Sequence, residues 1–205
     1  MSKIKVKPPK AIKLLEKELQ ELFHDGNISL GEIDQYSGHY CIVRGRGVEI
    51  YFDKDLNHQI GLLPLKLETG DEYLLSISIT VNTSTMTIKS IAVSFYTYEK
   101  DKLFRAEWGK NESNIKHAQP HWHIHYNSPT LRTWIDEGEF DQDEEINIYT
   151  KFHKIHFAMF ASWHVDNEHV IDLTGNHKSI INWILEVIKY VKIQLIYLKN
   201  KSLIK

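Results

Sequence analysis

The chain has 205 residues, 42% of them hydrophobic and 25% charged, and its formal net charge at pH 7 is -2. A chain of this length can bury a hydrophobic core as a single domain over residues 1–205. The composition is that of a globular protein rather than a disordered one. Because the charge is slightly negative, the sequence has no general attraction for nucleic acid or for an anionic membrane, and a nucleic-acid partner is disfavoured.

Several features bear on where the protein resides. Its single cysteine, Cys41, excludes an intrachain disulfide, so the fold does not depend on an oxidising compartment. The basic segment 1–10 is not followed by the apolar stretch and cleavage site of a signal peptide. Charged residues such as Glu186 and Lys189 interrupt the apolar segment 180–198, which favours a packed helix over a membrane span. We therefore expect a cytoplasmic protein with no membrane partner.

The first predicted element is a helix over about residues 9–25. Its apolar residues recur at helical spacing, and Gly26 follows at the point where a left-handed residue can end the helix. These apolar residues are Ile12, Leu15, Leu19, Leu22 and Phe23. Residues 27–38 are mostly polar, and we expect a loop there.

Strands are predicted from about residue 39 to residue 126. A hairpin is expected at 39–53, followed by a loop at 54–69 with a short extended piece at 60–65. The strongest strand signals come from four later segments in which apolar and polar residues alternate. These segments are 71–82, 86–98, 102–108 and 121–126.

The alternation in these four strands separates two faces of a sheet, because successive side chains on a strand point to opposite sides. One face is mainly apolar, and the other carries Ser and Thr, then Arg105 and Glu107, then His121, His123 and His125. A consistent pleat would pack the apolar face on helices and turn the polar face outward. We therefore expect an α+β fold, with an antiparallel sheet of about five to seven strands packed on one face by N- and C-terminal helices.

The last part of the chain carries the strongest helix signal. An acidic run at 136–145 predicts a solvated segment, and residues 150–163 are compatible with either a helix or a strand. A helix is expected over about residues 176–199, with an apolar stripe that is wide for one small domain. We therefore expect this helix to join two copies of the chain, or the chain and another protein. Its stripe consists of Ile180, Ile181, Ile184, Val187, Ile188, Val191 and Leu195.

A histidine-rich segment, residues 117–169, holds eight of the twelve histidines. Histidine is the commonest metal ligand and the side chain most easily poised for proton transfer near neutral pH. His121, His123 and His125 alternate on one strand face, with neighbours roughly 6.5 Å apart, so two imidazoles can converge on one ion. The sequence therefore predicts a divalent metal centre, with zinc, manganese, nickel or iron as the ion and with His121 and His123 as ligands.

The other residues of this site follow from the same strand faces. The third ligand is expected to be His164, with His169 or Glu107 as alternatives, and Glu107 can instead act as a general base. Arg105 would stabilise negative charge, and His125 completes the expected catalytic residues. The function predicted from this set is a metal-dependent enzyme, most simply a hydrolase.

Three alternatives stay open at this point. The first is a non-enzymatic binding or assembly subunit that acts through the last helix or through the polar face of the sheet. The second is a metal-independent, histidine-based nuclease in which Arg105 holds a phosphate. The third is that the histidines make only ordinary cross-strand contacts. No glycine-rich phosphate loop is present in the sequence, so no nucleotide cofactor is expected.

Overall fold

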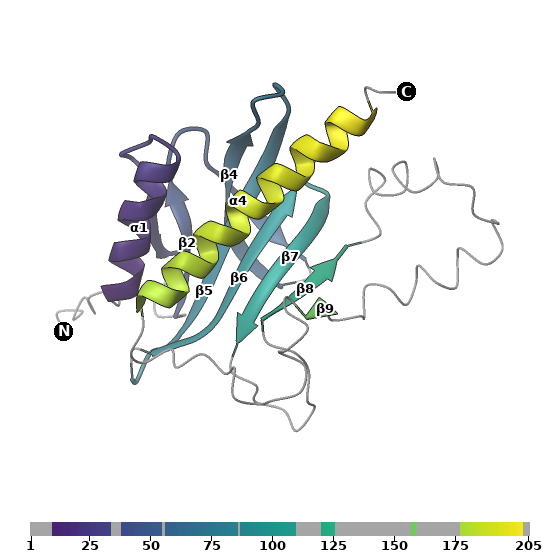
Figure 1. Ribbon diagram of the computed structural model, residues 1–205. Coiled ribbons are helices and arrows are strands. Elements are labelled where there is room, and N and C mark those ends of the chain that lie inside the picture. The colour runs from purple at the N-terminus through teal and green to yellow at the C-terminus, as the bar shows by residue number, and fades with distance from the viewer. Residues whose placement is uncertain are drawn as a thin grey trace.

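The structure, a computed structural model, describes residues 10–33, 38–54, 56–85, 87–109, 120–125, 157–158 and 177–202. These residues form one antiparallel sheet of nine strands and two helices, α1 (Lys10–Leu22) and α4 (His177–Ser202). Both helices lie on the same face of the sheet, and α4 crosses the central strands (Figure 1). The predicted α+β class and the single helical layer are confirmed, and the sheet is larger than the five to seven strands expected.

The strands follow the order β1-β2-β5-β6-β7-β8-β9, and β4 pairs with both β3 and β5. Their bounds are β1 Ser29–Glu32, β2 His39–Arg44, β3 Glu49–Asp53, β4 His58–Lys66, β5 Glu72–Asn82, β6 Thr87–Tyr96, β7 Lys102–Gly109, β8 His121–Ile124 and β9 Phe157–Ala158. Strand β1 lies where a loop was expected. Leu30 is its only large apolar residue, so the segment is too short to show alternation, although Leu30 is buried. The short strand β9 lies in the segment 150–163, for which helix and strand were both open.

The main core lies between the helices and the apolar face of the sheet. The stripe predicted on the last helix is buried in it, and Tyr190, Ile193 and Tyr197 on the other side of α4 are exposed. Neither described helix is long and apolar enough to cross a membrane. Core residues with no more than 2% of their surface exposed include Ile12, Leu15, Leu19, Ile77, Val93, Ala106, Ile180, Ile184 and Ile188.

The face of the sheet away from the helices is not the exposed surface that the sequence predicted. Ser76 in β5 and Ser94 in β6 are each only 2% exposed. Strands β3 and β4 form a hairpin that contributes to a second, smaller core on this side. The buried residues of that core are Ile60, Leu62, Leu74 and Tyr96. Strand alternation separates the two faces correctly, but it carries no information about a distant hairpin that covers one of them.

The hairpin leaves the sheet at a close crossing of two backbones. Strands β2 and β4 pair with the same edge of β5. Strand β4 pairs with the first half of β5 and β2 with the second half, so β2 and β4 must separate where one pairing ends and the other begins. At the separation, Gly61 of β4 lies against the carbonyl group of Ile42 in β2, and a Cβ atom at Gly61 would overlap that oxygen. Only glycine fits this position without a backbone shift.

Gly61→Ala is therefore expected to lower the free energy of unfolding by about 1–3 kcal/mol, because the added methyl group must push two strands apart. Gly26→Ala is the matched control, since nothing lies within 4 Å of a Cβ atom there. Urea denaturation of both variants measures the difference. Equal effects at the two glycines would contradict the crossing described above.

Candidate metal centre

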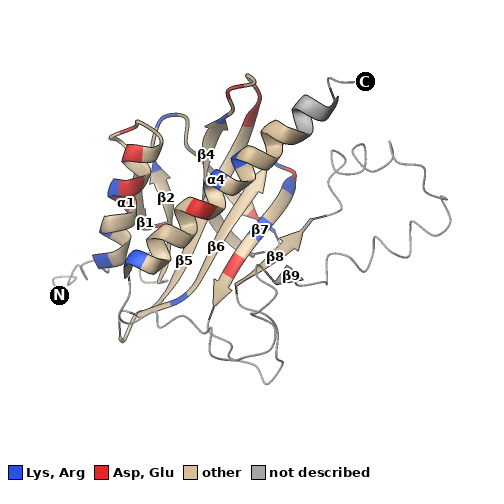
Figure 2. Cartoon of the chain, in the orientation of Figure 1, with Lys and Arg blue, Asp and Glu red and all other residues tan. Residues whose placement is uncertain are grey.

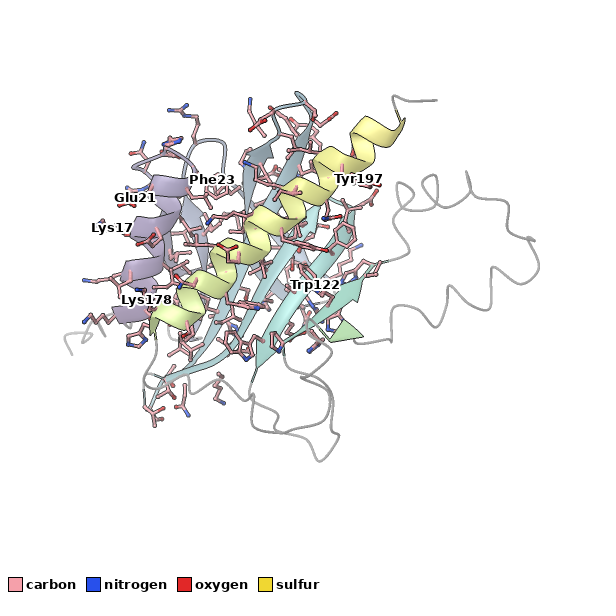
Figure 3. All side chains as sticks on the ribbon, viewed as in Figure 1. Lys17, Glu21, Phe23, Trp122, Lys178 and Tyr197 are labelled. Atoms are coloured by element: carbon pink, nitrogen blue, oxygen red, sulfur yellow. The ribbon has the colours of Figure 1, made fainter. Side chains whose placement is uncertain are left out.

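Strands β7 and β8 bring the predicted site residues together through their pairing. Arg105 lies opposite His123, and Glu107 lies opposite His121. The residues between them face the other way. Trp122 lies on the helix side (Figure 3). Its ring centroid is 6.3 Å from that of Tyr190 on α4. The four site residues therefore share the face away from the helices, as the alternation predicted. Strand β7 carries basic and acidic positions close together (Figure 2).

Three ligand-type atoms converge at this point. His121 Nε2 lies 2.9 Å from His123 Nε2, and Glu107 Oε2 lies 3.1 Å from His123 Nε2 and 3.8 Å from His121 Nε2. Ligand bonds of 2.0–2.1 Å place neighbouring ligand atoms roughly 3.4 Å apart around a tetrahedral zinc ion, and roughly 3 Å apart around an octahedral ion. The three atoms thus form a triangle of the size that one face of a metal coordination shell requires, and the cluster can hold a metal ion.

The site is buried on one side and open on the other. His121 is 1% and His123 8% exposed, whereas the Glu107 side chain is 31% exposed. Burial raises the pKa of Glu107, but the hydrogen bond from His123 and the positive charge of Arg105 outweigh it and lower that pKa to about 2. Glu107 is therefore ionised at neutral pH, as a metal-binding carboxylate must be.

The two imidazole nitrogens lie within hydrogen-bond distance of each other. At 2.9 Å, one of the two Nε2 atoms must carry the hydrogen, and a proton on His123 Nε2 also satisfies the Glu107 carboxylate 3.1 Å away. His121 Nε2 then directs its lone pair toward His123 Nε2. Two imidazole nitrogens and one carboxylate oxygen thus converge on one point, which a cation could occupy.

Arg105 forms the side of the cluster next to Glu107. Its Nη2 lies 3.1 Å from Glu107 Oε2, and its side chain is 15% exposed. Its Nε is buried and has no hydrogen-bond partner within the part of the chain that the structure describes. A buried guanidinium N–H group without a partner is costly, so this donor is suited to a ligand.

Of the remaining predicted residues, His125 stands apart from the triangle. His125 follows directly after β8, where its backbone N–H donates to the carbonyl of Leu103 and its ring centroid lies 6.4 Å from that of His123. His164, the third ligand predicted from the sequence, lies outside the described residues, as does His169. In the described structure Glu107 occupies the third position.

A second polar cluster on the same face was not anticipated. The rings of His39 and His58 stack with centroids 4.9 Å apart, and His58 Nε2 lies 3.5 Å from the hydroxyl of Ser78. Cys41 lines a cavity of about 20 Å³ with them, and burial raises the pKa of its thiol to about 11, which makes it a poor nucleophile. The position of His39 two residues before Cys41 in a β-rich run was the available signal, whereas His58 fell in a predicted loop.

Comparison with known proteins finds no family that matches the chain, and no curated protein or solved structure matches it either. The case for a function therefore comes from the geometry of Glu107, His121 and His123.

Proposed function

We propose that the protein is a metal-dependent hydrolase whose divalent ion is held by Glu107, His121 and His123. The observation that carries the proposal is the convergence of one ionised carboxylate and two imidazole nitrogens within 4.8 Å of one another. Two histidines with one carboxylate form a donor set used by catalytic zinc sites and by non-haem iron sites. Three protein ligands leave coordination positions open for water or substrate, which distinguishes a catalytic site from a closed structural one.

Ordinary cross-strand contacts account less well for this cluster. Exposed polar pairs on a sheet contribute only a few tenths of a kcal/mol and need not point at one another. Here both histidines are buried, and their nitrogens face each other across 2.9 Å. Buried polar groups cost free energy unless they are fully paired, and a bound ion would satisfy three of them at once.

The surrounding residues have distinct roles in this proposal. A bound divalent ion would lower the pKa of its water ligand to about 7 and so supply hydroxide near neutral pH. Arg105 would hold negative charge on the substrate next to the ion. His125 is the residue proposed for proton exchange, since a group near the site can act through one water. Glu107 serves as a ligand rather than as the general base.

Metal content is the direct test. Protein purified without a histidine tag is expected to retain close to one divalent ion per chain. Glu107→Gln and His123→Gln should weaken metal affinity by at least about 100-fold, because even residues outside the first coordination shell contribute 10–100-fold. His58→Gln is the matched control, because His58 belongs to the other cluster on the same face. Affinity should also fall below about pH 6, where protonated imidazole no longer binds metal.

The alternatives give different results. A chain that stays metal-free after incubation with zinc, manganese, nickel and iron contradicts the proposal. Hydrolysis of a phosphodiester by the metal-free protein, unaffected by a chelator, would favour the metal-independent nuclease. Elemental analysis together with activity measured with and without chelator separates these cases.

A further inference from the structure

We infer that the metal centre takes a phosphate monoester, with the phosphate group bridging the ion and Arg105. This inference rests on the proposed metal site and names its substrate class. It starts from the short distance between Arg105 Nη2 and Glu107 Oε2, 3.1 Å, because the same oxygen belongs to the ligand triangle. An ion bound there would lie within roughly 5 Å of the guanidinium, given a metal–oxygen bond of about 2 Å.

With a divalent ion bound, the positive and negative charges of the site do not cancel. A divalent ion, one guanidinium and one carboxylate leave two positive charges, because the ligating histidines are neutral. The other buried ion pair described on this face, Asp53 with Lys102, is neutral as a pair and adds nothing. Uncompensated charge beside buried histidines is expensive, so the site favours a ligand with two negative charges. A phosphate monoester carries about that charge at neutral pH.

The hydrogen-bonding groups point to the same ligand. Arg105 Nε is buried without a partner among the described residues, although Nη2 is engaged with Glu107. A guanidinium presents its donors in a planar fork that matches two oxygens of a phosphate. Phosphate has a further oxygen for the ion, so one group can satisfy both cations. The exposed side of Glu107 gives this ligand a route from solvent.

The reaction follows from this arrangement. The oxygen of a water molecule on the ion would form a bond to phosphorus as that water gives up a proton, and the bond between phosphorus and the alcohol oxygen would break. The alcohol oxygen takes up the proton that the water lost, which leaves a free alcohol and inorganic phosphate. Arg105 would stabilise the charge that spreads over the phosphate oxygens during transfer. Inorganic phosphate is therefore a product and a suitable binding probe.

Calorimetric titration of the zinc-loaded protein with inorganic phosphate tests the inference. We expect phosphate to bind the loaded protein at least tenfold more tightly than the metal-free protein. Arg105→Met should weaken phosphate binding at least tenfold while zinc content is retained. The phosphate affinity of Arg105→Lys should lie between those of the wild type and Arg105→Met, because lysine keeps the positive charge but lacks the planar pair of N–H donors. Lys66→Met is the control, because Lys66 is an exposed cation on β4, paired with Glu72 and outside the site.

The outcomes separate this inference from the proposed function. A chain that binds no metal overturns both. A chain that binds zinc but binds phosphate no better than the metal-free protein overturns the inference alone. Unchanged phosphate affinity in Arg105→Met, or acetate binding as tight as that of phosphate, would also overturn it. Thermal denaturation of each variant checks that it is folded, and Arg105→Lys supplies a second measurement if Arg105→Met does not fold.

Discussion

Replacement of Ile184 by aspartate is expected to abolish stable folding. Ile184 lies in the first half of α4 and is 0% exposed, as part of the main core between the helices and the sheet. The substitution removes apolar contacts and buries a carboxyl group that finds no partner, a combination expected to cost about 5 kcal/mol or more. Domains of this kind have a total stability of about 5–15 kcal/mol. Circular dichroism and urea denaturation should therefore show a largely unfolded protein, whereas Ile184→Ala should fold with a loss of about 2–5 kcal/mol.

Ile193→Asp is the matched control, with the same substitution in the same helix. Ile193 is 61% exposed, so its replacement should change the free energy of unfolding by less than about 1 kcal/mol. Comparable losses in the two variants would mean that α4 does not pack as described. The control also addresses the predicted oligomer, because Tyr190 and Tyr197 are exposed on the same side. A wild-type dimer that becomes a monomer in Ile193→Asp would support assembly through this helix.

The architecture could be predicted from the sequence where one periodic pattern decides the structure. The stripe containing Ile184 and Ile188 has the period of a helix, and the alternation around Ile77 and Val93 has the period of a strand, so each element has one face that must be buried. These patterns give the layers and the direction in which each side chain points. They depend only on neighbours along the chain, which is why they needed no knowledge of tertiary contacts.

The candidate site could be predicted in part for the same reason. Alternation places His121 and His123 on one face, and the same rule places Glu107 on that face. Which residue stands opposite which depends on the register of β7 against β8, and the loop-like segment between these strands fixes no register in the sequence. Glu107 was therefore one of several candidates for the third ligand until the pairing placed it opposite His121.

The burial of the polar face could not be predicted, because it depends on contacts between distant segments. The hairpin of β3 and β4 is joined to the sheet by a buried network that alternation does not reveal. Asp53 accepts a hydrogen bond of 2.6 Å from the Tyr96 hydroxyl and pairs with Lys102 Nζ at 2.8 Å. Asp53 is 2% exposed, and the Lys102 side chain is 7% exposed. In the sequence these are three polar or amphipathic residues on three separate strands.

Lys102→Met is expected to lower the free energy of unfolding by about 3–5 kcal/mol, because it leaves the Asp53 carboxylate buried without its cation. Lys100→Met is the matched control. Lys100 pairs with Glu49 on the same hairpin, but the Glu49 side chain is 57% exposed, so this loss should stay below about 1 kcal/mol. Urea denaturation at pH 7 compares the two. Adding Asp53→Asn to Lys102→Met should recover part of the loss, since it removes the stranded charge.

The same pair predicts how stability changes with pH. Burial raises the pKa of Asp53, but hydrogen bonds from Lys102 and Tyr96 and the charge of Lys102 outweigh it and hold that pKa below its ordinary value. A carboxyl whose pKa is lowered on folding stabilises the protein above its unfolded pKa of about 3.9, and the contribution is lost as pH falls through the folded value. In Lys102→Met only burial and the weaker hydrogen bonds remain, so the pKa of Asp53 should rise and acid should destabilise this variant less.

Unfolding curves measured from pH 7 down to pH 3 therefore test the network directly. At pH values below about 4, the free energy of unfolding of the wild type should decrease. The difference in the free energy of unfolding between the wild type and Lys102→Met should become smaller over the same pH range. Other carboxyls with a lowered pKa, such as Glu107, are present in both proteins and cancel in the difference. A gap that stays constant from pH 7 to pH 3 would mean that Asp53 titrates no differently in the two proteins, and that Lys102 stabilises the hairpin by packing rather than by charge.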